Sequence, residues 1–196
     1  TLNRLKEQLK SGKPEFALQS VESAYGKAAV INRILQAIQE MGKSLNSAAS
    51  WESVYLGPLI SEIVALHERT KTAQIKIQPN LPEVKAPKEP LIYILSNLLN
   101  YALTHNPSYS PQIHVDYELL SEMHSVSVSD NGAPLNLGSE TEPFSPISSD
   151  AENEEANAKG VGLKISRYLA QRIGGNLIFQ ATNKGNKFTF EWPAKT

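Results

Sequence analysis

Three short segments between residues 96 and 175 constrain the fold of this 196-residue chain more than any other feature. They are residues 96–102, 129–135 and 160–165, the last of which runs on to the pair Gly174 and Gly175. A side-chain amide, a carboxylate beside a glycine, and glycines at a helix start can each hold one part of a purine nucleotide. A fold that uses all three must bring distant segments of the chain to one site.

Hydrophobic spacing beyond Trp51 predicts a mixture of helices and strands. Helical spacing covers three segments, which are residues 58–71, 90–106 and about 161–173. Strand-like alternation covers residues 74–78, 112–119 and 124–129, and two final strands flank the turn at 183–186. Helices and strands in this order, with antiparallel hairpins, predict an α+β fold in the form of a two-layer α/β sandwich.

The first 49 residues show the heptad spacing of a coiled coil. Small and apolar residues recur at alternating steps of four and three, at Ala17, Val21, Ala24, Ala28, Ile31, Leu35 and Ile38, and three leucines keep the same rhythm before them. The break at residues 11–14 predicts the tip of a helical hairpin. We expect residues 1–49 to form a dimerisation hairpin, with homodimer contacts through residues 1–45, and residues 50–196 to form a second domain. An amphipathic helix that packs on its own domain remains an alternative.

Composition excludes several classes of function. The formal net charge of −1 provides no general attraction to nucleic acid, so we expect no nucleic-acid partner. The chain contains no cysteine, which excludes disulfides, thiolate nucleophiles and cysteine-based zinc sites within it. No stretch has the length of apolar residues that spans a bilayer, and we expect a cytoplasmic protein or the soluble part of a larger sensor.

In order and spacing, the three segments resemble the N, G1 and G2 boxes of two-component sensor histidine kinases, whose ATP-binding domains have the GHKL-type fold. Residues 142–144, Glu-Pro-Phe, stand where that family carries its F box. The resemblance covers roughly residue 50 to the C-terminus. It implies ATP with magnesium as ligands, a dimeric kinase-type arrangement, and a response regulator as partner. A serine kinase of the anti-sigma type on the same sandwich is a third possibility, although such proteins lack a heptad hairpin in this position.

The resemblance also implies a role for individual residues at the nucleotide site. Asp130 would accept a hydrogen bond from the adenine amino group, and Gly132 would let the backbone approach the ring. Gly160 and Gly162, followed by Leu163, would open a helix whose backbone amides seat the phosphates.

Substitutions at the implied metal and phosphate positions predict a weakened or lost nucleotide site. Asn97 matches the first asparagine of the N box, but Tyr101 stands at the second, and a phenol is a poor ligand for magnesium. Asn100, one residue off the pattern, is the second candidate magnesium ligand. In addition, Pro134 replaces the second glycine of the G1 pattern, and Ala158 replaces the first glycine of the G2 pattern.

The distribution of charged residues also predicts a weakened nucleotide site. No Lys or Arg occurs between Lys88 and Lys159, whereas four acidic residues, Asp150, Glu152, Glu154 and Glu155, precede the glycines. Sites for highly charged phosphates usually supply cations. A solvated loop that stays away from the site accounts for these acidic residues equally well.

No catalytic residue can be identified in this chain. The resembled kinases phosphorylate a histidine on the dimerisation hairpin, but all four histidines here, His67, His105, His114 and His124, lie beyond Trp51. His67 precedes Glu68 and Arg69 as in an H box, yet we expect it on a helix of the second domain. Two hypotheses follow. The chain is a histidine kinase region with a degenerate ATP site, or it is a catalytically inactive scaffold that binds a signalling partner without ATP.

Overall fold

The computed structural model describes residues 50–66, 73–134, 144 and 154–195, and the side chains of all of these except 154–161. They lie within one compact unit, Glu40–Thr196. The expected dimerisation hairpin, and His67, fall outside the described residues. The helices and strands, in chain order, are β1 (Glu52–Tyr55), α3 (Leu56–Ala65), β2 (Gln74–Ile77), β3 (Glu83–Ala86), α4 (Lys88–Thr104), β4 (Gln112–Leu120), β5 (Met123–Asp130), α5 (Glu154–Arg172), β6 (Asn176–Thr182) and β7 (Gly185–Pro193).

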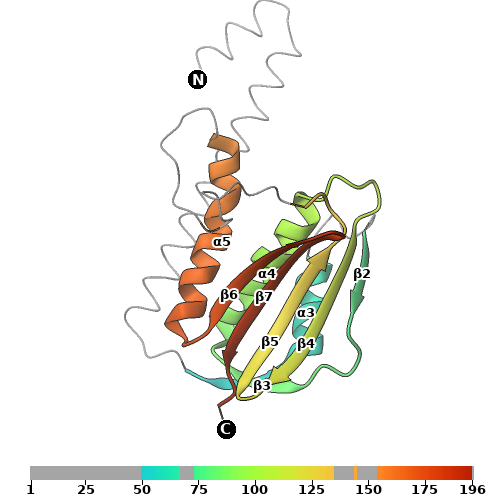
Figure 1. Ribbon diagram of the computed structural model, residues 1–196. Coiled ribbons are helices and arrows are strands. Elements are labelled where there is room, and N and C mark those ends of the chain that lie inside the picture. Colours follow the sequence, from blue (N-terminus) through green and yellow to red (C-terminus); the bar gives the residue numbers. More distant parts are fainter. Residues whose placement is uncertain (1–49, 67–72, 135–143, 145–153, 196) are drawn as a thin grey trace, which may run out of the picture. The chain divides into compact units, whose positions relative to one another are not determined.

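Five strands form one mixed sheet in the order β2, β4, β5, β7, β6. Strand β2 runs parallel to β4, and the other neighbours are antiparallel. Figure 1 shows α3, α4 and α5 together on one face of this sheet. The predicted mixed α/β fold, with helices layered on a sheet, is therefore confirmed.

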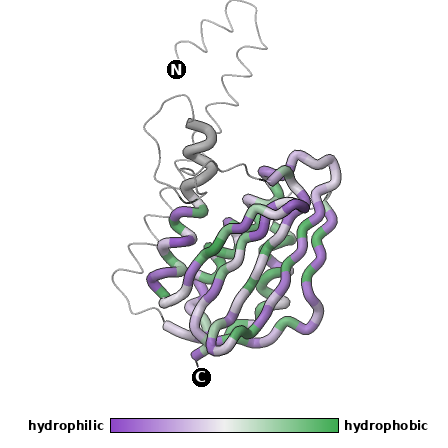
Figure 2. The backbone as a smooth tube through the Cα atoms, viewed as in Figure 1, coloured by the Kyte–Doolittle hydropathy of each residue, from purple (hydrophilic) through white to green (hydrophobic). Residues whose placement is uncertain are grey.

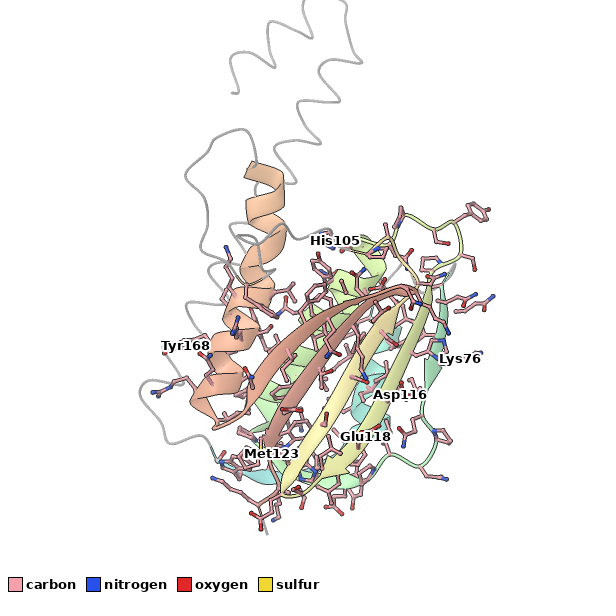
Figure 3. All side chains as sticks on the ribbon, viewed as in Figure 1. Lys76, His105, Asp116, Glu118, Met123 and Tyr168 are labelled. Atoms are coloured by element: carbon pink, nitrogen blue, oxygen red, sulfur yellow. The ribbon has the colours of Figure 1, made fainter. Side chains whose placement is uncertain are left out.

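Alternating side chains explain why the sheet has one covered face. In the pairing of β4 with β5, Val115 lies opposite Val128 and both are fully buried, whereas Asp116 lies opposite Ser127 on the other face. The hydropathy along β4 and β5 changes in step with this alternation (Figure 2). Asp116 and Glu118 project from β4 on the face turned away from the helices (Figure 3). The period of two residues therefore sends apolar side chains to the helices and polar ones outward.

Two short strands were not predicted. Strand β1 pairs antiparallel with β3, and this small sheet is tied to the main one because Trp192 Nε1 donates a hydrogen bond to the Lys85 carbonyl over 3.2 Å. Each strand has four residues, and each pairs with a partner that is distant in the sequence. No helix among the described residues has both the length and the hydropathy to span a membrane.

The start of α5 corrects an expectation. We expected this helix to begin near Val161, but it begins at Glu154, so Gly160 and Gly162 lie inside it. Two glutamates occupy its first positions, where their negative charge interacts favourably with the positive end of the helix dipole. Alanines, which have high helix propensity, follow them. These local preferences outweigh the helix-weakening effect of the glycines.

The end of α5 follows the expected pattern, in which a glycine pair turns the chain into the next strand. Gly174 has a φ of +79°, a conformation that glycine adopts without strain. The N–H of Gly175 donates to the Ala170 carbonyl over 2.9 Å, and that of Gly174 donates to Gln171 over 3.1 Å. A side chain at Gly175 would overlap the Glu191 carbonyl. Glycine is thus required where α5 meets the sheet.

Candidate functional site

Asp130 ends β5 at the edge of the covered face, with its carboxylate held by hydrogen bonds from Gly132 and Asn186. The backbone N–H of Gly132 donates to Asp130 Oδ1 over 2.6 Å, and Asn186 Nδ2 donates to the same oxygen over 3.3 Å. Asn186 also donates to the Ala133 carbonyl over 3.1 Å. The backbone N–H of Asn186 also hydrogen-bonds to this carboxylate. A carboxylate has about four lone-pair sites, so it can accept a further hydrogen bond from a ligand.

A second asparagine network fixes the loop that follows Asp130. Asn106 Nδ2 donates to Asn131 Oδ1 over 2.8 Å, and the backbone N–H of Gln112 donates to that same oxygen over 2.9 Å. The N–H of Asn131 in turn donates to the Gln112 carbonyl over 3.2 Å. The end of α4, the start of β4 and the end of β5 are therefore joined at one point. The sequence interpretation assigned no role to Asn106 or Asn186, and their turn-like surroundings gave no signal for one.

Two glycines beside Asp130 lie where the surrounding atoms leave no room for a side chain. A Cβ at Gly132 would stand 2.7 Å from Asp130 Oδ1 and 3.4 Å from Asn106 Cγ. Gly185, which has a φ of +143°, lies directly against the Asp130 carbonyl. A larger residue at either position would displace the aspartate or its strand.

Burial shapes the electrostatics of this aspartate. It raises the pKa of the Asp130 carboxyl above its ordinary value, and the hydrogen bonds from Gly132 and Asn186 offset part of that rise. Burial, and to a smaller extent the Asp130 charge, raises the pKa of Tyr101 to about 12. The phenol of Tyr101 is therefore neutral and lies within electrostatic reach of the carboxylate.

Tyr101 is enclosed by aromatic rings at this end of the sheet. Its ring stacks on His105 with centroids 4.0 Å apart, and it meets the edge of Phe188 at 5.1 Å. Figure 3 shows His105, the residue that follows α4, at the end of the sheet where β5 stops and β7 starts. His105 Nδ1 lies 3.1 Å from the Tyr101 carbonyl oxygen and 3.0 Å from the Thr104 hydroxyl. The rings thus bridge α4 and the sheet beside Asp130.

Asn97 and Gly162, assigned to metal and phosphate by resemblance, come together where α4 meets α5. The carboxamide Nδ2 of Asn97 donates to the Tyr93 carbonyl over 2.9 Å, and a Cβ at Gly162 would overlap Asn97 Oδ1. Ser166, fully buried, donates from Oγ to the Gly162 carbonyl over 2.8 Å. Asn97 and Gly162 therefore form a tight contact between the two helices.

The remaining predicted residues lie in different surroundings. Leu163 is 1% exposed and belongs to the core. Asn100 is half-buried on α4, and Gly160 is an interior residue of α5. Phe144, from the expected F box, lies with its ring centroid 4.9 Å from the Arg167 guanidinium carbon of α5. The other two F-box positions are outside the described residues.

The donor set around Asn97 and Tyr101 does not fit magnesium. Magnesium requires carboxylate, amide or water oxygens in a near-octahedral shell. Tyr101 offers only a buried, neutral phenol, and the Asn97 oxygen faces the α5 backbone at Gly162. No cluster of three or more His, Asp or Glu suited to a metal ion exists among the residues with described positions.

Comparisons with known proteins identify relatives in sequence and in fold. The chain is 23% identical over 189 residues to the adaptive-response sensory kinase SasA of Synechocystis, covering 92% of this chain but only 49% of that relative. Two solved structures share the fold. Histidine kinase ThkA in complex with the response regulator TrrA has a TM-score of 0.63 at 21% identity, covering 84% of this chain and 48% of that one. Full-length ShkA in complex with AMPPNP has a TM-score of 0.65 at 22% identity, covering 94% and 39%.

The family model described as histidine kinase-, DNA gyrase B- and HSP90-like ATPase matches residues 87–196, which include both Asp130 and α5. The chain belongs to this family, which confirms the GHKL-type domain that the ordered boxes predicted.

Proposed function

We propose that this chain is the adenine-nucleotide-binding region of a sensor-kinase-like signalling protein, with Asp130 as the residue that recognises adenine. The observation that carries the proposal is the half-buried carboxylate at the end of β5, which Gly132 and Asn186 hold in a fixed orientation. A carboxylate accepts hydrogen bonds only, which suits the amino group of adenine and repels the carbonyl that guanine carries at the same ring position.

Phosphoryl transfer by this site is proposed to be weak or absent. The expected magnesium position holds Tyr101, and the expected phosphate-binding glycines lie inside α5. Of the described histidines, His114 is exposed on the outward face of the sheet, His124 is buried with its Nδ1 2.9 Å from the Tyr117 hydroxyl, and His105 is stacked on Tyr101 near Asp130. The sequence has no histidine in the expected dimerisation hairpin, residues 1–49, so we propose a region that binds adenine without an acceptor histidine in that hairpin.

The proposed partners are a second copy of the chain, through residues 1–45, and a response regulator. The heptad spacing of the first 49 residues supports the former. The latter is supported by the similarity of fold to histidine kinase ThkA, which was solved in complex with the response regulator TrrA.

Calorimetric titration of the full chain tests adenine recognition. We expect a non-hydrolysable ATP analogue to bind and the matching GTP analogue not to bind. Asp130→Asn should weaken adenine binding by about tenfold or more, because its amide group can present a donor where the ligand needs an acceptor. The matched control is Asp116→Asn, since Asp116 is exposed on the outward face, and it should bind like the unaltered protein. Equal affinities in all three proteins would contradict the role of Asp130.

A second candidate function is a scaffold that binds its signalling partner without any nucleotide. The burial of Tyr101 beside Asp130 favours it, because an aromatic side chain replaces a polar one at the site. The two candidates differ in one result. A scaffold would show no adenine binding at millimolar concentrations yet would still bind a response regulator.

A further inference from the structure

The two ends of the implied nucleotide site differ in what they retain. At one end, Asn186 and Gly132 fix the orientation of the Asp130 carboxylate, which has lone pairs to accept a further hydrogen bond. At the other end, Asn97, Tyr101 and Gly162 are used for packing. This difference between the two ends limits which ligands the site can bind. The conclusion about the ligand rests on the proposed recognition of adenine by Asp130.

At the metal position, Tyr101 is 9% exposed and held from two sides by rings. The stack on His105 and the edge contact with Phe188 fix the ring between α4 and the sheet. Freeing the phenol for a cation would break both contacts, and a neutral phenol would then replace a water that magnesium holds strongly.

The first N-box asparagine is already engaged. Its Nδ2 donates to Tyr93, and its oxygen lies where α5 passes closest, at Gly162. If Asn97 turned toward a cation, it would lose the Tyr93 bond and the packing that a glycine at 162 permits. This side chain therefore serves the contact between helices.

The phosphate position has no unpaired backbone donors in this conformation. The first four N–H groups of a helix lack internal partners, whereas later ones donate to the carbonyl four residues before. Because α5 begins at Glu154, Gly160 and Gly162 lie beyond that first turn. No Lys or Arg occurs from residue 89 to 158, so the segments that carry Asn97 and Asp130 bring no cation to a triphosphate. The amides of Gly160 and Gly162, inside α5, are not arranged to bind one either.

We infer that the Asp130 site binds the adenine end of its ligand without a divalent cation and draws little affinity from a triphosphate, so that its ligand is an adenine nucleoside or a nucleotide of low charge. The ring of Tyr101 takes the place of the metal. The fixed Asp130 carboxylate supplies the polar contact that selects the base.

Titration of the full chain with adenosine, ADP and ATP, each in magnesium and in EDTA, tests this inference. We expect the affinity for adenosine and ADP to change by less than about threefold between the two conditions, and ATP to bind no more tightly than adenosine. Affinity that falls by about tenfold or more in EDTA would overturn the inference while leaving adenine recognition in place. No binding of any adenine ligand in either condition would overturn the proposed function and the inference with it.

Three variants test which residue makes ligand binding independent of magnesium. Tyr101→Phe keeps the ring and should bind like the unaltered chain, whereas Tyr101→Asn should make the affinity for ATP depend on magnesium. Asn100→Ala tests the neighbouring amide and should change nothing. Loss of ATP binding in Asn100→Ala, seen only with magnesium present, would show that Asn100 holds a metal and would contradict the inference. The comparison of magnesium with EDTA in the unaltered protein decides the question even if Tyr101→Asn fails to fold.

Discussion

At the scale of single residues, the candidate site was partly visible in the sequence. Asp130 and Gly132 could be predicted because an acidic residue, an asparagine and a glycine directly after an apolar strand form a sharp local signal. Asn186 could not, because its bond to Asp130 spans 56 residues and its own neighbours resemble an ordinary hairpin turn. Contacts that arise only from strand pairing leave no local pattern.

The close approach of Gly132 to Asp130 predicts the effect of one added methyl group. Gly132→Ala should lower adenine affinity by about tenfold or more, because the new Cβ would meet Asp130 Oδ1 at 2.7 Å and push the carboxylate aside. Titration calorimetry measures the change. Gly57→Ala is the matched control, since its Cβ would make only an ordinary contact of 3.9 Å with Leu81 Cβ. Unchanged affinity in Gly132→Ala would mean that the carboxylate does not contact the ligand.

The raised pKa of Asp130 predicts a stability that depends on pH. The folded protein binds this proton more tightly than the unfolded chain, so the stability linked to Asp130 is present at acid pH. It is lost as pH rises from the ordinary value of 3.8 through the raised folded value. Asp130→Asn, which has no charge to bury, should therefore be more stable than the unaltered protein at neutral pH.

Urea unfolding at neutral and acid pH measures this difference between the two proteins. The advantage of Asp130→Asn should shrink as the pH falls below the titration window. A difference that stays constant across the pH range, or a variant that is less stable at neutral pH, would contradict a buried and ionised Asp130.

At the scale of helices and strands, periodicity predicted the long elements and missed those set by distant partners. The helix expected at residues 90–106 is observed as Lys88–Thr104, and the strand expected at 112–119 as Gln112–Leu120. Strands β1 and β3 exist because they pair with each other across a sequence gap that contains a helix and another strand. The early start of α5 shows that two internal glycines alone are a poor marker of a helix boundary.

The contact between α4 and α5 predicts a coupling between two positions. Gly162→Ala should destabilise the domain by about 1–3 kcal/mol, because its Cβ overlaps Asn97 Oδ1. Asn97→Ala removes that oxygen, so the double variant should be more stable than the sum of the two single changes implies. Thermal or urea unfolding of the four proteins measures the coupling. Additive effects would show that the two side chains do not meet.

The interior position of Gly160 in α5 is tested in the same way. Gly160→Ala should stabilise the domain by up to about 1 kcal/mol, the usual preference for alanine over glycine inside a helix. A clear loss of stability would indicate that residue 160 is not helical in solution.

At the scale of the whole molecule, the sequence predicts a two-part chain of which the structure describes the second part. The family match, residues 87–196, lies within this second part. The dimerisation hairpin at residues 1–49 remains a prediction from heptad spacing. Ile31→Glu combined with Leu35→Glu should convert dimers to monomers, because charges in a heptad seam are costly to bury. Light scattering after size-exclusion chromatography measures the mass, and an intact dimer in the double variant would exclude this seam.

The most direct test of adenine recognition is a nuclear magnetic resonance titration of the ¹⁵N-labelled chain with adenosine, observed at individual amide groups. The account predicts saturable shifts at the Gly132 backbone N–H and at the Asn186 side-chain amide, because both donate to the carboxylate that adenosine would engage. The same shifts should appear with EDTA present. Shifts confined to other parts of the molecule, such as the outward face around Asp116 and Glu118, would show that the ligand binds elsewhere and would contradict the account.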